Sequence, residues 1–357
     1  MREYNLVPFS QIDPESLLWL WYERIPLGKI SLLVGNPGIG KSVLSMYIAA
    51  QVSRGAEWPD QPCIREGTFD EEIGDYVGDG VIILTTEDDL NDTVRVRLEA
   101  ADANLSNIYT LTVKKTYKGE ESEEPIYNLI DSLDLLEQAI KDKGNIALVI
   151  LDPITGYMGT LNSNSNTEVR SFLNMLKILA EKYEVAVLGI SHLNKNSELE
   201  AAYRILGSIG FNAGARSVWM VISNPADEDS RLLLPVKGNV GKNPKGLEFK
   251  LVSTEVDTAD GTIESVRCAF ERDTVYRTAD EVLAEEKKKQ RAPVKHSIKR
   301  WLEDVLKNGA VDVKVIESKA AKDSIGTRTL RRAKEDMNIK SKKEGNKWIW
   351  MLPKKEE

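Results

Sequence analysis

The sequence contains an eight-residue stretch, GNPGIGKS, whose residue types and spacing could hold phosphate groups. It fits the pattern G-x-x-x-x-G-K-[ST], in which glycines let backbone N–H groups turn toward phosphate oxygens at the start of a helix. In this pattern Lys41 reaches the terminal phosphates of a nucleotide, and the hydroxyl of Ser42 binds Mg²⁺. The predicted nucleotide-binding residues are Gly35, Asn36, Pro37, Gly38, Ile39, Gly40, Lys41, Ser42 and Val43. The alternative is a glycine-rich turn that contains a lysine by chance.

Carboxylates follow two other apolar runs of the sequence. Asp152 ends the run LVILD, where it can bind Mg²⁺ beside Ser42; the alternative is a helix-capping aspartate. Glu87 directly follows VIILTT, and a carboxylate there can orient the water that attacks a phosphate. Asp88 is the competing candidate for this role, whereas Asp89 is expected to cap the next helix.

A histidine ends a further apolar run, VAVLGISH. A lone histidine is more often structural than functional. At the carboxyl end of a strand, however, His192 would face the crevice where parallel sheets bind their ligands. We therefore predict that His192 senses the terminal phosphate.

The elements that must position these residues alternate between strand and helix. Buried strands are expected at 29–35, 81–86, 147–153 and 185–192, and helices at 42–55, 89–103, 128–144 and 169–183. Such alternation predicts an α/β fold with a mostly parallel sheet. Two further strands, at 217–223 and 231–239, are expected to form a hairpin. Residues 56–79 are expected to form an irregular excursion or hairpin, and residues 114–125 a charged loop.

Length and composition limit the class of protein. A chain of 357 residues suggests two domains, and 41% apolar with 29% charged residues argues against wholesale disorder. The sequence has neither an apolar run of about 18 residues nor a basic segment followed by an apolar one, so we expect no membrane span and no signal peptide. Cys63 and Cys268 are far apart, which excludes a disulfide scaffold and favours a cytoplasmic protein.

Charge is unevenly distributed along the chain. Residues 287–357 contain 21 lysines and arginines against 10 acidic residues, whereas residues 1–286 contain 27 against 46. A basic tail on an acidic body predicts a polyanionic partner; a solvated lysine-rich tail is the alternative. We expect a core at 1–280, a charged linker at 281–295 and a separate module at 296–357.

The C-terminal module has the pattern of a winged helix-turn-helix. The stretch DSIGTRTLRR places a turn before a basic helix with Thr327 as its expected N-cap, and a terminal hairpin follows. The predicted DNA-binding residues here are Arg328, Arg331, Arg332, Lys334, Lys342 and Lys343. They predict binding of duplex DNA through the major groove, and contact with a protein is the alternative.

Together these motifs resemble a known family. The strings LLVGNPGIGKS, ILTTEDD, LVILDP, GISHLNK and GSIGFNAGARSVWMV are similar to RecA/DnaB-type ATPases, and more closely to the RepA-like replicative helicases of plasmids and phages. The resemblance covers residues 20–250. It implies a RecA-like core with ATP and Mg²⁺ as cofactors, a hexameric homo-oligomer, and movement along single-stranded DNA in a central channel. A non-motor RecA-like nucleoprotein ATPase, a helicase loader and an ATP-gated DNA-binding regulator remain open.

The resemblance also implies roles for individual residues. Lys41 and Ser42 match the end of the Walker A motif, Glu87 the catalytic glutamate, and Asp152 the Walker B aspartate. His192 matches the histidine that couples the nucleotide state to the DNA-binding loops.

Other implied roles concern a neighbouring subunit and DNA. Arg216 matches an arginine finger for the neighbour's ATP, although its surroundings in the sequence alone favour a surface salt bridge. DnaB-type relatives carry a lysine–arginine pair on a late strand; here Lys237 has no nearby arginine, so it is expected to act with Arg216. DNA-binding loops are implied at 159–168 and 194–212, and Lys195 and Arg204 are the candidates in the second.

Overall fold

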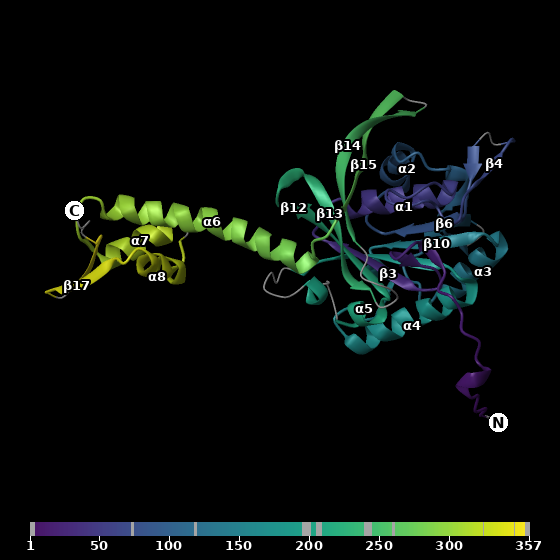
Figure 1. The fold of residues 1–357 in the computed structure, drawn as a ribbon, viewed down its shortest axis with the longest axis horizontal. Coiled ribbons are helices and arrows are strands. Elements are labelled where there is room, and N and C mark those ends of the chain that lie inside the picture. Colours follow the sequence, from purple (N-terminus) through teal and green to yellow (C-terminus); the bar gives the residue numbers. More distant parts are fainter. Residues whose placement is uncertain are drawn as a thin grey trace. The chain divides into compact units, whose positions relative to one another are not determined.

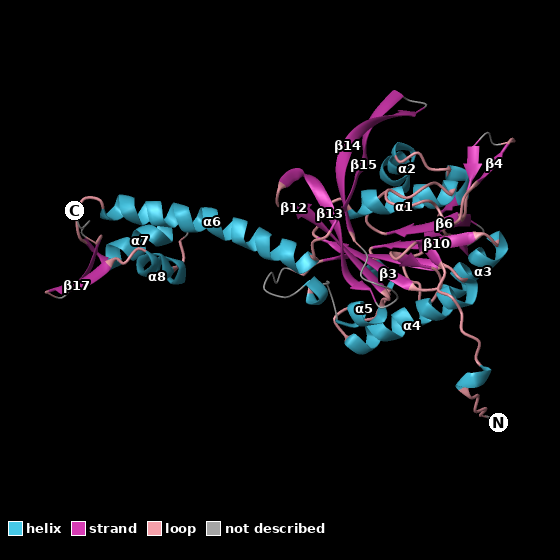
Figure 2. Cartoon of the chain, viewed as in Figure 1, coloured by secondary structure: helices cyan, strands magenta, loops and turns pink. Residues whose placement is uncertain are grey.

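The computed structural model describes residues 4–72, 75–117, 120–194, 201–204, 209–238, 245–258, 261–323, 325–345 and 347–353. The chain divides into two compact units, Met1–Val282 and Leu283–Glu357. Figure 1 follows the chain through its elements, and Figure 2 separates helices from strands. Within the described residues, no helix is both long and apolar enough to cross a membrane.

A nine-stranded sheet forms the centre of the first unit. Its strands are β3 (Ile30–Gly35), β6 (Gly80–Thr85), β7 (Ile108–Tyr109), β10 (Ile146–Asp152), β11 (Ala186–His192), β12 (Ser217–Asn224), β13 (Asp227–Gly238), β14 (Gly246–Thr258) and β15 (Gly261–Val275). Their order is β15-β14-β13-β12-β3-β11-β10-β6-β7. Neighbours from β12 to β7 are parallel, and β13, β14 and β15 are antiparallel additions. The α/β fold with a mostly parallel sheet is therefore confirmed.

Helices cover both faces of the sheet, which is why its central strands are apolar along their whole length. α1 (Lys41–Arg54) and α2 (Arg95–Ala100) lie on one face, with α1 against β6 and β10. On the other face α4 (Asn166–Tyr183) contacts β3 and β11, and α3 (Leu133–Lys143) and α5 (Ile209–Gly214) pack against α4. Fully buried Leu44 and Leu148 belong to the core between α1 and the sheet.

Short elements complete the first unit. They are η1 (Phe9–Gln11), β1 (Trp19–Trp21), β2 (Ile25–Pro26), β4 (Thr68–Asp70), β5 (Asp75–Val77), the π-helical turn η2 (Leu90–Val94), η3 (Leu105–Asn107), β8 (Thr112–Tyr117), β9 (Glu120–Pro125), η4 (Ile154–Tyr157) and η5 (Ala201–Tyr203). β4 and β5 form a hairpin inside the excursion expected at 56–79.

The charged loop predicted at 114–125 is wrong. β8 and β9 form an antiparallel hairpin there, with Lys114 opposite Glu123 and their side chains 3.4 Å apart. Opposite charges that face each other across a strand pair stabilise it, so alternating charge need not indicate a loop.

The long antiparallel pair β14–β15 was not predicted. Its inner half is apolar and buried: Phe249 packs on Phe270, and Phe270 on Tyr47 of α1. Its outer half is polar, although Val256 packs on Val96 and Ala100 of α2. Because each strand changes from apolar to polar along its length, the periodicity of its residues does not predict it as one strand.

The second unit has its own hydrophobic core. It contains most of α6 (Ala279–Leu306), followed by α7 (Val313–Lys322), α8 (Thr327–Asp336) and a sheet in the order β16 (Val311–Asp312), β18 (Lys347–Met351), β17 (Lys340–Glu344). Leu302, Ile316, Leu330 and Trp350 are buried together in its core.

Two local expectations for this region need correction. Residues 281–295, expected to be a linker, are helical within α6, because Glu, Lys, Arg and Ala favour a helix. Thr327 is the first residue of α8 and not its N-cap: Gly326 occupies the cap position, and no side chain caps the helix.

Candidate active site

The phosphate-binding pattern lies between β3 and α1, as its sequence predicts. Gly38 and Gly40 have φ of 73° and 101°, a region that favours glycine. A Cβ on Gly35 would lie 2.6 Å from the carbonyl oxygen of Val221, and one on Gly40 would lie 2.9 Å from Leu251 Cδ1. The loop therefore packs closely against β12 and β14, and its glycines are required by conformation and by space.

Lys41 is held inside this loop. Its side chain is buried, and Nζ donates to the carbonyl oxygens of Gly35 and Asn36, each at 3.0 Å. Nζ also lies 3.1 Å from Nδ1 of His192. Burial lowers the pKa of Lys41, and the nearby carboxylates of Asp152 and Glu87 oppose this shift.

Strand register brings His192 and Glu87 to the same edge of the sheet. His192 pairs with Gly35 across β11 and β3, and Asp152 pairs with Thr85 across β10 and β6. His192 Nε2 lies 3.4 Å from Glu87 Oε1. An ammonium group only donates, so Nδ1 accepts from Lys41 and Nε2 carries the hydrogen that points to Glu87. Lys41, His192 and Glu87 thus form a continuous polar chain.

Asp152 lies at the buried end of β10. It is 3% exposed, and its side chain is hydrogen-bonded to that of Ser42. Burial raises the pKa of Asp152, and Glu87 and Asp88 raise it further, while the Ser42 hydrogen bond and Lys41 lower it. A hydroxyl and a carboxylate side by side among negative groups form an oxygen donor set that fits Mg²⁺.

In the described part of the chain, no group of three or more His, Cys, Asp or Glu side chains could hold a metal ion by itself. This agrees with the way Mg²⁺ binds in nucleotide sites, where one or two protein oxygens act together with substrate phosphates and water.

The acidic residues after β6 separate into different roles. Asp88 Oδ2 accepts from Arg97 Nη1 at 2.6 Å. Asp89 accepts from the backbone N–H groups of Asn91 and Asp92 and caps the turn, as predicted. Glu87, whose side chain is half exposed, faces His192. Of the three carboxylates, only that of Glu87 contacts His192. Glu87 is linked to Lys41 through this histidine.

Arg216 lies at the opposite edge of the sheet. It precedes β12, its backbone N–H donates to the carbonyl oxygen of Ile30 at 2.9 Å, and its side chain is exposed. Ile30 begins β3, so about 16 Å of strand, at 3.3 Å per residue, separate this edge from the phosphate loop that starts at Gly35.

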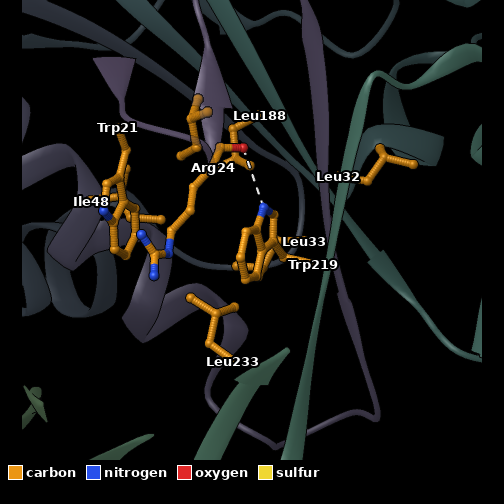
Figure 3. A pocket seen from close by; sticks show the side chains of 9 residues that line it. Trp21, Arg24, Leu32, Leu33, Ile48, Leu188, Trp219 and Leu233 are labelled. Atoms are coloured by element: carbon orange, nitrogen blue, oxygen red, sulfur yellow. Dashed lines mark hydrogen bonds between the residues drawn. The ribbon is translucent and has the colours of Figure 1, made fainter. Parts of the chain in front are cut away.

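A buried arginine that the sequence reading missed fixes the start of β12. The Arg24 carbonyl accepts from Ser217 Oγ at 2.7 Å and from Trp219 Nε1 at 3.2 Å. Its guanidinium lies over the rings of Trp21 and Trp219 (Figure 3). It also forms an ion pair with Asp60. Asp60, Ser217 and Trp219 are far from Arg24 in the sequence. The sequence pattern that could have indicated this site is the pair of tryptophans near residue 20.

The ammonium group of Lys237 contacts the segment that precedes β12. Its Nζ donates to the carbonyl oxygens of Asn212, Ala213 and Ala215, at 2.6, 3.3 and 2.9 Å. All three protons of the ammonium group are therefore engaged at the C-terminal end of α5. Burial and the nearby Arg216 lower the pKa of Lys237. These contacts hold the segment that carries Arg216, and the catalytic role expected of Lys237 stays a prediction.

The predicted DNA-binding residues have different surroundings. Lys195 lies outside the described residues. Arg204 is buried, with 7% of its surface exposed, and its contact with DNA stays a prediction. In the second unit Arg328, Arg331 and Arg332 are exposed on α8. Lys334 Nζ lies 5.0 Å from the centre of the Trp350 ring. Lys342 and Lys343 are exposed on β17, and Lys342 lies 3.3 Å from Glu344.

Comparison with known proteins finds a matching family model. A family model described as "AAA domain" matches residues 5–198, which include all the site residues from Gly35 to His192. Among curated proteins no match was found. Of the solved structures, 490 chains match; one is the "ATPase Domain of G40P", with 12% identity and a TM-score of 0.43 over 63% of this chain and 81% of that chain.

Proposed function

The chain belongs to the AAA domain family, and from this premise we propose that it hydrolyses ATP as a ring-forming DNA helicase of the RepA-like class. The observation that carries the proposal is the convergence of Lys41, His192, Glu87 and Asp152 at the edge of the sheet that bears the phosphate loop.

The roles of the residues follow from their contacts. The backbone of the phosphate loop and Lys41 bind the phosphates, and Glu87 orients the attacking water. Ser42 and Asp152 would hold Mg²⁺, which would supply positive charge to the phosphates when bound. His192 links Lys41 to Glu87, so the arrival of a terminal phosphate at Lys41 changes the surroundings of the water-orienting carboxylate.

Arg216 acts on the ATP of a neighbouring copy. An arginine side chain extends about 7 Å, much less than the 16 Å or so of strand between Arg216 and its own phosphate loop. In a heterologous ring, the amino-terminal edge of one sheet can meet the carboxyl-terminal edge of the next. ATP then lies between subunits, and Arg216 stabilises the transition-state charge from across the interface. We take the ring to be hexameric, with single-stranded DNA in its channel.

The second unit supplies the contact with duplex DNA. α7, α8 and the hairpin β17–β18 have the order of a winged helix, and α8 carries Arg328, Arg331 and Arg332 on its exposed side. We propose that α8 enters the major groove while β17 contacts the phosphates. Because arginines that contact phosphate give affinity and little sequence information, this unit tethers the ring to duplex DNA with little sequence preference.

The test is unwinding of a forked DNA duplex by the purified protein with ATP, with Lys41→Ala as the control. Hydrolysis is measured in parallel with and without single-stranded DNA. We expect unwinding that the control lacks. Hydrolysis stimulated by DNA without unwinding would contradict the motor and support a loader, a coat protein or a regulator.

A further inference from the structure

A groove in the second unit is not explained by ATP hydrolysis or by duplex binding. It lies between the three-stranded sheet, the first turns of α7 and one side of α8, and its volume is about 550 Å³. Pockets of this size hold ligands as large as a nucleotide. The residues that decide its chemistry are Trp348, Trp350, Arg331, Lys314 and Lys347.

The two tryptophans of β18 differ in exposure although they share a face of the sheet. Successive side chains of a strand alternate between faces, so Trp348 and Trp350 point to the same side. Trp350 is 5% exposed and belongs to the core of the unit, whereas Trp348 is 55% exposed. The aromatic surface therefore starts in the core and continues into solvent, where Trp348 has a ring face free for a ligand.

Cationic side chains line the same groove as Trp348. Arg331 on α8, Lys314 on α7 and Lys347 on β18 all line the groove, and Lys343 lies directly across from Trp348 in the strand register. Two carboxylates also line it: Asp312 accepts from the backbone N–H of Lys314 and lies 3.9 Å from Lys347 Nζ, and Glu317 lies on the next turn of α7.

The second unit as a whole also carries more basic than acidic residues. Residues 283–357 contain 21 lysines and arginines against 12 acidic residues, and this excess of positive charge favours a polyanionic partner. An exposed aromatic ring within a basic groove is the arrangement that binds single strands, because every base has a π-face and every link a phosphate. A base in duplex DNA is stacked and paired, and it has no face to offer.

We propose that this groove binds single-stranded DNA by stacking one unpaired base on Trp348, with the flanking phosphates against Arg331, Lys314 and Lys347. A carboxylate such as Glu317 accepts from the exocyclic amino group of that base. The inference deepens the proposed DNA binding of this unit and rests on it: the unit would recognise a junction, with duplex on α8 and an unpaired strand beside the hairpin.

The test uses the full-length protein and two probes of one sequence. The first is a single-stranded oligonucleotide with 2-aminopurine, whose fluorescence reports stacking, and the second is the labelled blunt duplex. We expect Trp348→Ala to lose the change in 2-aminopurine emission and to weaken single-strand binding about 5- to 100-fold, the range of one stacked base. Trp348→Phe should retain most of both, and duplex binding should change less than about twofold in either variant.

Matched controls separate stacking from charge and from unfolding. Tyr276→Ala removes an aromatic side chain that is 76% exposed in the first unit, and it should change nothing. Arg331→Ala with Lys347→Ala should lower the slope of log affinity against log salt for the single strand by about one to two, and Lys307→Ala should not. Thermal unfolding of each variant checks that the unit stays folded.

The inference is overturned if Trp348→Ala keeps the emission change and the single-strand affinity, or if the blunt duplex loses as much affinity as the single strand. Wild-type protein that binds the single strand and not the duplex contradicts the proposed role of α8. It supports the inference only where Trp348→Ala weakens that binding, because the ring channel is also proposed to hold single-stranded DNA. Wild-type protein that binds neither probe overturns both.

Discussion

The ammonium nitrogen of Lys41 lies 3.1 Å from Nδ1 of His192, although 151 residues separate them in the chain. The contact exists because β3 and β11 are adjacent parallel strands, in which Gly35 pairs with His192. Lys41 has to leave this nitrogen to reach a terminal phosphate. His192 also faces Glu87, so the lysine proposed to bind phosphate and the carboxylate proposed to orient water are linked through one imidazole ring.

Substitution of His192 tests this link. His192→Phe keeps the ring shape and removes both nitrogens, so we expect nucleotide affinity to stay within a few-fold while turnover falls about 10- to 100-fold. His192→Gln offers an acceptor and a donor on one amide, and it should retain more turnover than the phenylalanine variant. Steady-state hydrolysis and binding of a fluorescent ATP analogue measure the two effects. Equal turnover in the two variants would contradict a role for the hydrogen bonds.

Glu87 and Asp88 form a matched pair for testing the water-orienting role. Glu87→Gln should bind ATP normally and lower the rate of hydrolysis about 10²- to 10⁴-fold, because the amide cannot take a proton from water. Asp88 is paired with Arg97, so Asp88→Asn should leave hydrolysis within about threefold of wild type. Single-turnover hydrolysis separates the chemical step from binding. A larger loss in Asp88→Asn than in Glu87→Gln would reassign the role.

Asp152 should control the response to Mg²⁺. Its buried carboxylate is hydrogen-bonded to Ser42, and neutralising it removes the main negative charge offered to the cation. We expect Asp152→Asn to require at least about tenfold more Mg²⁺ for half-maximal hydrolysis, in a titration after treatment with EDTA. Ser42→Ala should shift the same midpoint in the same direction. An unchanged midpoint in both variants would exclude them as ligands.

The convergence of the candidate site residues could be predicted from the sequence because the signals are local. The phosphate loop has a fixed spacing, and Glu87, Asp152 and His192 each follow an apolar strand. Parallel strands place their carboxyl ends at one edge, so three separate local patterns predicted a shared site. The contact of Lys41 with His192 was not predicted, because it depends on which strands are neighbours.

Features that depend on distant contacts could not be predicted in this way. Arg24 is a surface residue by type, yet it is buried because Trp21, Trp219 and Asp60 meet around it. Lys237 was predicted to be catalytic, and its ammonium group donates to carbonyl oxygens in and just after α5. Apart from Trp21, which is three residues from Arg24, the partners of both residues lie more than 20 residues away in the chain.

The ion pair of Arg24 should be important for stability. Arg24→Ala would leave Asp60 without its buried partner, so we expect the free energy of unfolding to fall by about 3 to 5 kcal/mol. The pair Lys29–Glu181 is more exposed, with side chains 26% and 39% exposed, so Lys29→Ala should cost about 1 kcal/mol or less. Urea unfolding followed by tryptophan fluorescence compares the two. A cost for Arg24→Ala no larger than that for Lys29→Ala would contradict this role of the pair.

Mixing two inactive variants tests whether Arg216 acts across a subunit interface. Arg216→Ala should keep ATP binding and lose turnover, and Lys41→Ala should lose turnover through its own phosphate loop. In a mixed ring, an interface between the loop of an Arg216→Ala subunit and the arginine of a Lys41→Ala subunit is intact. With equal amounts and random assembly, about one quarter of the interfaces are of this kind, so about one quarter of wild-type turnover should return.

The matched control for this experiment is a mixture of Lys41→Ala with Glu87→Gln, whose lesions lie in the same nucleotide site. Every interface of that ring carries one of the two lesions on the side of the phosphate loop, so no turnover should return. Recovery in the first mixture and none in the second can arise only if Arg216 completes a neighbour's site. Failure of the first mixture, with mixed rings shown to form by mass spectrometry, would remove Arg216 from the active site.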